Sequence, residues 1–318
     1  MDNVPLPFTS PFDTLLHHWL FEALAFGYAR NGDLLNTRRV TSDSQWLELT
    51  SVNPDQDTFI RRRLQILFCA HKCAVNPYKS SPNSLNRAED IASSFYRLWP
   101  HPSHQLDMDL TAQDYLLKMQ FLLHYSYAVY GKPKFDLIWS TWQDMVENLV
   151  MPQKSIVTLV AFAIARDQYP WQVKMNHAME FIRQVKEIDV NLITLRCVKY
   201  IMDALVYTRS LDTALRGESL TWLAWAEKLT RTTLQRLEAN KEDIPRVMLD
   251  YLWLSRCGAY SRLGLVDSLE VTVRERWTGH QLSPDLAKTK QWQDLLRRSS
   301  MFRDIITRMT DINVSANP

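Results

Sequence analysis

Glycine is scarce in this chain, with seven residues in 318, whereas globular proteins average ~7%. Glycine serves tight turns that need a positive φ and places where the backbone closely approaches a ligand, so its scarcity argues against folds rich in β-hairpins. The composition is otherwise that of a folded protein, with 46% hydrophobic and 23% charged residues, which excludes global disorder. Eleven tryptophans and eleven methionines supply large, adaptable side chains for a wide helical core.

Long apolar runs are also missing. The nearest candidate, residues 156–165, is much shorter than the ~20 residues that a membrane helix needs, so no membrane insertion is expected.

The first 29 residues contain no Lys or Arg and include Asp2, Asp13 and Glu22, which fits neither a secretory signal nor a mitochondrial presequence. Four scattered cysteines indicate reduced thiols rather than a disulfide scaffold. We therefore expect an intracellular protein, cytoplasmic or nuclear, and a mitochondrial one only if a presequence is missing from this numbering.

Catalytic and phosphate-binding motifs are absent too. The sequence contains neither G-x-G-x-x-G nor G-x-x-x-x-G-K-[ST], and neither G-x-S-x-G nor H-E-x-x-H. We therefore expect a chain without catalytic residues and without a small-molecule cofactor. An all-α enzyme that carries no recognisable motif is the alternative.

Apolar residues recur at helical spacing along most of the chain. The clearest pattern runs from residue 111 to residue 217, where each of three units consists of a helical run, a break and a second helical run. The breaks fall at Gly131, at Tyr169-Pro170 and at Arg209-Ser210. Helices joined by short breaks pack as antiparallel hairpins, so the sequence predicts an all-α fold of stacked antiparallel helical hairpins with an irregular helical N-terminal part.

Two irregular connectors, residues 79–83 and 100–110, indicate a boundary before these hairpins. The predicted organisation is an extended arm (1–11), an N-terminal helical subdomain (12–110), a helical-hairpin repeat region (111–311) and a frayed tail (312–318). We expect residues 33–54 to be largely irregular and one final helix to run from Ser283-Pro284 to about Met309. Thr111 and Asp114 have the spacing of a helix-capping box.

Three segments resemble parts of pentatricopeptide repeats. Residues 131–153, with Trp139, Met145 and the sequence Val-Met-Pro-Gln at their end, resemble the second helix of such a repeat and its exit. Residues 178–191 resemble the next second helix, and residues 26–33 the junction between paired helices. This resemblance implies a tetratricopeptide- or pentatricopeptide-like α-solenoid, and RNA binding in organellar gene expression as the alternative function. A looser similarity, to the helical regulatory regions of fungal zinc-cluster transcription factors, implies a regulator without the six-cysteine DNA reader, which is absent from this sequence.

A stack of helical hairpins exposes a concave face that is made by one helix of each pair and binds extended partners. We therefore expect a non-catalytic scaffold or complex subunit. The net charge of +2 favours a protein partner over RNA. The candidate contact residues lie on the first helices of the hairpins: Tyr115, Lys118, His124, Arg166, Arg196 and Lys199.

Arginine clusters are the candidates for a basic patch that contacts RNA or an acidic partner: Arg38, Arg39, Arg61, Arg62 and Arg63. Consecutive helical residues are ~100° apart around the helix axis, so three adjacent arginines cannot all face one phosphate track. An ordinary solvated surface is the alternative interpretation.

Cysteine and histidine residues come close to the composition of a zinc site. Cys69 and Cys73 are four residues apart on one predicted helix, and His101 and His104 follow in a loop. Two thiolates and two imidazoles are a common tetrahedral zinc set. However, zinc-binding cysteine pairs usually lie in knuckle turns, and buried reduced cysteines commonly pack as small hydrophobes. We therefore predict no metal site and keep zinc as the alternative.

Overall fold

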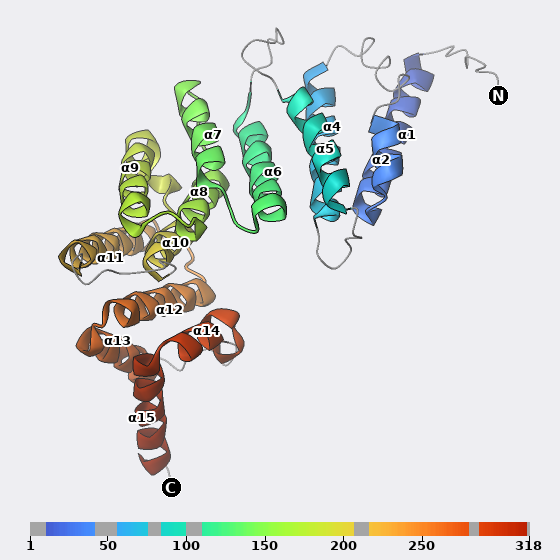
Figure 1. Ribbon diagram of the computed structural model, residues 1–318. Helices are drawn as coiled ribbons and strands as arrows, with labels where there is room; N and C mark the ends of the chain where they lie inside the picture. The colour runs from blue at the N-terminus through green and yellow to red at the C-terminus, as the bar shows by residue number, and fades with distance from the viewer. Residues whose placement is uncertain are drawn as a thin grey trace. The chain divides into compact units, whose positions relative to one another are not determined.

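The computed structural model describes residues 11–41, 56–75, 84–99, 110–206, 216–279 and 286–316. Within these ranges every regular element is a helix and no strand occurs, which confirms the predicted all-α class (Figure 1). Contacts divide the chain into two compact units, Met1–Val150 (unit 1) and Met151–Pro318 (unit 2). The predicted boundary at residue 110 lies inside unit 1, and the predicted arm lies almost entirely outside the described residues.

Unit 1 is built around helix α4. Its described helices are α1 (Pro11–Asn31), α2 (Leu34–Thr41), α4 (Gln56–Ala74), α5 (Ser84–Leu98), α6 (Ala112–Tyr130) and α7 (Phe135–Glu147). Helix α4 contacts α1, α2, α5 and α6, and α6 also contacts α7. At the α5–α6 contact, the rings of Phe95 and Phe121 stack with centroids 3.8 Å apart, and both side chains are fully buried.

The ends of α6 follow from the sequence. The Thr111 backbone N–H and hydroxyl both donate to Asp114 Oδ2, at 2.8 and 2.7 Å, which confirms the predicted capping box. Gly131 ends the helix with a left-handed φ of 66°, and its N–H donates to the Tyr127 carbonyl. Glycine adopts this conformation at little cost, so the predicted break between α6 and α7 is confirmed.

Unit 2 is built around helix α10, which packs against both α8 and α12. Its helices are α8 (Lys154–Arg166), α9 (Trp171–Asp189), α10 (Leu195–Val206), α11 (Arg216–Ala239), α12 (Arg246–Leu263), α13 (Val266–Gly279), α14 (Lys290–Arg298) and α15 (Ser300–Ala316), with short 3₁₀ turns at Val190–Leu192 and Leu286–Lys288. Helix α10 packs along both α8 and α12, while α9, α11 and α13 contact the helices that precede them (Figure 1). The first predicted hairpin, α6 and α7, therefore belongs to unit 1, and the next two belong to unit 2.

Two local predictions are wrong. Residues 34–41 form a helix where irregular structure was expected, because the Asp33 carboxylate accepts the Asn36 N–H at 3.1 Å and so caps the helix. The expected single C-terminal helix is divided at Ser299. The Ser299 hydroxyl accepts the Phe302 N–H at 2.9 Å and begins α15, which continues to Ala316 through much of the predicted tail.

Candidate functional site

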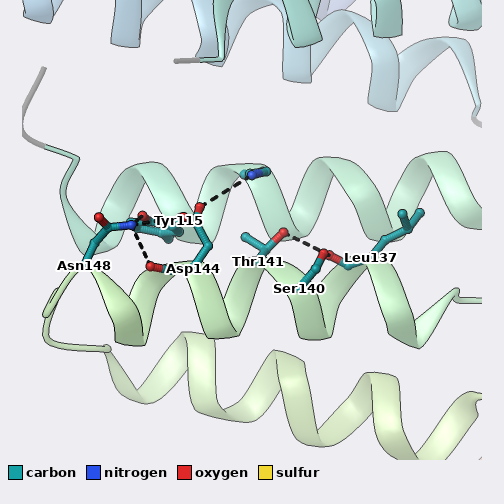
Figure 2. A network of polar contacts seen from close by, with 7 residues as sticks. Tyr115, Leu137, Ser140, Thr141, Asp144 and Asn148 are labelled. Atoms are coloured by element: carbon teal, nitrogen blue, oxygen red, sulfur yellow. Dashed lines mark hydrogen bonds and ion pairs between the residues drawn. The ribbon is translucent and has the colours of Figure 1, made fainter. Parts of the chain in front are cut away.

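The predicted contact residues of α6 lie inside unit 1. Tyr115 is fully buried, and its hydroxyl accepts a hydrogen bond from Asn148 Nδ2 at 3.2 Å (Figure 2). Burial, reinforced by the nearby Asp144 carboxylate, raises the pKa of Tyr115 to about 12. The Lys118 ammonium lies 3.9 Å from Asp144 Oδ2 and 4.6 Å from the centroid of the Trp99 ring. The contacts to Asn148 and Asp144 tie α6 to α7, and Tyr115 lies inside unit 1.

The other predicted contact residues are mostly engaged within their own units. His124 is half-buried against the Phe68 ring, and burial lowers its pKa. Arg166 lies over the Phe162 ring, and Lys199 donates to Asp203 Oδ2 at 2.6 Å. Arg196 alone among the six is exposed. Five of the six predicted contact residues are therefore buried or half-buried within their own units, and one is exposed.

Most of the predicted basic patch is matched by acidic side chains of unit 1. Arg38 pairs with Asp90 at 2.8 Å, Arg61 with Asp114 at 3.0 Å and Arg62 with Glu22 at 3.2 Å. Arg63 is half-buried, and burial lowers its pKa, whereas Arg39 is exposed. The three consecutive arginines point toward different neighbours, as the helical geometry predicts. They do not form a continuous positive track.

The zinc alternative is only partly within the described residues. Cys69 and Cys73 are half-buried on α4, and Cys73 Sγ lies 3.9 Å from the Arg30 carbonyl oxygen. His101 and His104 lie outside the described ranges. In the part of the chain that the structure describes, no group of three or more His, Cys, Asp or Glu side chains is placed to hold a metal ion.

The second helices of unit 2 carry a different candidate site. A pocket of about 250 Å³ lies between α9 and α11. On α9 its apolar lining comes from residues four apart, Trp171, Met175 and Met179, which share one helical face. On α11 it comes from Trp222 and Trp225, whose ring centroids are 5.6 Å apart. We call these five residues the Trp–Met pocket.

The polar rim of the Trp–Met pocket carries little charge. Gln172, Asn176 and Thr221 line it as neutral groups, and Glu218 is its one charged lining residue. Trp171 and Trp222 are each 4% exposed, and their indole nitrogens have no hydrogen-bond partner among the described residues. Met179 is 46% exposed. The pocket therefore combines rigid aromatic walls with a flexible, accessible thioether, a combination that suits an apolar side chain rather than a charged group.

Trp222 and Trp225 are three residues apart, a spacing at which two side chains share one helical face and are expected to pack together in the core. That interpretation holds for the buried Trp222 but misses the half-buried Trp225. The four-residue spacing from Trp171 to Met179 was the available signal. A sequence pattern identifies such a face but does not show whether another helix covers it.

Comparisons with protein-family models, with curated proteins and with solved structures gave no match to this chain. No helix within the described ranges is both long enough and apolar enough to cross a membrane.

Proposed function

We propose that this chain is a non-catalytic protein-binding scaffold and that the Trp–Met pocket of unit 2 receives an apolar segment of a protein partner. The observation that carries the proposal is the pocket itself, in which three tryptophans and two methionines line one opening between α9 and α11. Tryptophan and methionine are enriched in protein interfaces, whereas charged residues are depleted from interface cores. An amphipathic helix that presents apolar side chains at i, i+3 or i+4 and i+7 fits such a site.

The arrangement of helices supports a scaffold of helical hairpins. In unit 2, α10 contacts both α8 and α12, and α9, α11 and α13 each contact the helix that precedes them in the chain. We interpret this as a short α-solenoid in which the first helices supply the core and the second helices supply the binding surface. In this arrangement the second helices, rather than the first helices, carry the partner contacts.

Protein is a better fit than RNA for the partner. A protein that binds RNA through its backbone needs a track of uncompensated positive charge. Arg38, Arg61 and Arg62 are each paired with a carboxylate. The Trp–Met pocket has no basic residue in its lining and one acidic residue, Glu218, which disfavours a phosphate backbone there.

Site-specific photocrosslinking tests the proposal. A photoreactive amino acid is placed at Thr221, which is exposed on the rim of the Trp–Met pocket, in the full chain expressed in its native cells. We expect a discrete protein adduct that Met179→Glu suppresses, because a carboxylate beside an apolar anchor is costly to desolvate. Val271→Glu is the matched control, since Val271 is an exposed apolar residue on α13 outside the pocket.

Three outcomes contradict the proposal. The first is an adduct that survives Met179→Glu as well as it survives Val271→Glu. The second is a nuclease-sensitive adduct whose yield falls steeply as salt is raised, which identifies RNA and phosphate contacts. The third is the absence of any adduct at Thr221, with the chain folded.

A further inference from the structure

A second pocket in unit 2 lies where α8, α10 and α12 begin and α11 ends, and we call it the α8–α12 pocket. Its lining residues fall within 154–158, 191–196 and 242–248, together with Leu237. Its volume of about 440 Å³ is within the ~300–1,000 Å³ typical of small-molecule sites. Three of the lining side chains, Ile193, Leu195 and Leu237, are apolar and buried. The pocket therefore offers an apolar surface to the body of a ligand.

Two threonine hydroxyls of the lining have their protons engaged within the chain. The Thr158 hydroxyl donates to the Lys154 carbonyl at 2.7 Å. Thr194 Oγ1 lies 3.3 Å from Thr158 Oγ1, so Thr194 is the donor of this pair, and it also accepts the Cys197 N–H at 3.1 Å. A hydroxyl oxygen has two lone pairs, and each of these two oxygens keeps one. The threonine pair can therefore accept a hydrogen bond from a ligand but has no proton left to donate.

Four charged residues line the pocket, and two of them neutralise each other. Lys154 Nζ lies 3.7 Å from Glu242 Oε2. Arg196 and Asp243 are both exposed, and neither has an ion pair or a side-chain hydrogen bond among the described residues. The lining therefore presents one available positive group and one available negative group to a ligand, with no excess of either sign.

The stability of α10 does not explain Arg196. It is the second residue of this helix, and a positive side chain in the first turn of a helix interacts unfavourably with the helix dipole. A ligand carboxylate bound to the guanidinium would offset that cost. Asp243 differs, because it lies two residues before Pro245, the N-cap of α12, where the dipole favours a negative charge. Its ordinary role predicts an effect on stability, whereas a binding role predicts an effect on affinity for a cation.

We propose that the α8–α12 pocket binds a small zwitterion, an amino acid with an apolar side chain. Arg196 donates to its carboxylate, and Asp243 and the two threonine oxygens accept from its ammonium group. The apolar side chain of the ligand packs on the buried apolar lining. The pocket shares no lining residue with the Trp–Met pocket, so the inference stands whether or not the proposed protein partner is correct.

Calorimetric titration of the full chain with L-leucine and two analogues tests the site, at about pH 6.5, where an α-amino group is protonated. N-Acetyl-L-leucine keeps the carboxylate but has no ammonium group, and L-leucinamide keeps the ammonium group but has no carboxylate. We expect L-leucine to bind about tenfold or more tightly than either analogue, because each analogue loses a charge-assisted hydrogen bond.

Two variants separate the two charged contacts. Arg196→Ala should abolish the preference for L-leucine over L-leucinamide, because the group that binds the carboxylate is gone, and should keep the preference over N-acetyl-L-leucine. Asp243→Ala should do the opposite. Arg231→Ala is the control, since it removes an exposed arginine of α11 that lies outside the pocket and should leave both preferences unchanged.

The proposal is overturned by equal binding of the three compounds, or by no detectable binding of L-leucine at millimolar concentration. It is also overturned if either variant keeps both preferences of the wild type, because the charged group would then not contact the ligand. Arg196 and Asp243 are exposed, so their removal is not expected to prevent folding, and the melting temperature of each variant checks this.

Discussion

His71 is a titratable side chain in an apolar environment. It is fully buried on α4, its ring centroid lies 4.5 Å from that of Phe121 on α6, and neither ring nitrogen has a hydrogen-bond partner among the described residues. Burial, with a smaller contribution from His124, lowers the pKa of His71 to about 4. Its ordinary pKa is about 6.5, so the folded state holds this imidazole neutral over a pH range in which the unfolded chain protonates it.

The consequence is an acid-sensitive contact between α4 and α6. As the pH falls from about 6.5 toward about 4, the unfolded state takes up a proton that the folded state does not, and the free energy of unfolding decreases. We expect His71 to contribute a loss of about 2 kcal/mol between pH 7 and pH 5. Chemical denaturation at the two pH values measures it. His71→Phe, which keeps an aromatic ring, should reduce the pH dependence by that amount.

His124 and Lys72 lie near this site and must be considered in the same experiment. Burial lowers the pKa of His124, with the Lys72 charge as the second cause, so His124 adds acid sensitivity in the same direction. The His71→Phe variant should therefore retain a weaker pH dependence. An unchanged pH dependence in this variant would show that His71 is not protonated on unfolding in this range, and would contradict the assigned pKa.

At the scale of helices, Asp114 is the residue that connects the start of α6 to α4. Its carboxylate accepts both donors of Thr111 and also Arg61 Nε, at 3.0 and 3.1 Å, and Asp114 is 3% exposed. Asp114→Ala removes the cap and leaves the half-buried Arg61 without its carboxylate. We expect a loss of about 2–4 kcal/mol in the free energy of unfolding, between the cost of a lost cap and that of a broken buried pair.

Asp90→Ala is the matched control for this variant. The Asp90 carboxylate also pairs with an arginine, Arg38, but both side chains are more than half exposed. Solvent-exposed pairs contribute about 0–1 kcal/mol, so this variant should be close to the wild type. Equal losses in the two variants, measured by denaturant unfolding, would show that burial of the Asp114 carboxylate does not determine its contribution.

The same elements show what the sequence could predict. The capping box and the break at Gly131 are local features, readable from spacing and residue type, and the structure confirms both. Arg61 as the partner of Asp114 was not predictable, because 53 residues separate the two in sequence. The break at Ser299 was missed because apolar periodicity continues across it, whereas the interruption depends on one serine side chain.

The candidate site was less predictable than the helices. The prediction of the six contact residues requires that the first helix of each hairpin is exposed. In unit 2, α10 is covered by α8 on one side and α12 on the other, so exposure is decided by how hairpins pack together. Hydrophobic spacing identifies an apolar face of a helix, but it does not show what packs against that face. One such face of α9 lines the Trp–Met pocket.

At the scale of the whole chain, each unit has its own buried aromatic core. Phe121 is fully buried in unit 1, where it stacks on Phe95, and Phe181 is fully buried in α9 of unit 2. Truncating a buried phenylalanine to alanine typically costs ~3–5 kcal/mol, because it removes apolar contacts and leaves a cavity. After such a truncation, the backbone amides whose hydrogen exchange becomes faster show how far the loss of stability spreads along the chain.

We expect Phe181→Ala to accelerate amide hydrogen exchange throughout the helices of unit 2 while exchange in α4–α6 stays at the wild-type rate. Phe121→Ala should give the reverse pattern, and each variant is the control for the other. The physical reason is that each compact unit encloses a separate set of apolar contacts, so a cavity in one core does not remove contacts from the other. If either variant accelerated exchange equally in both units, the prediction would be wrong. The two units would then unfold together in one cooperative transition.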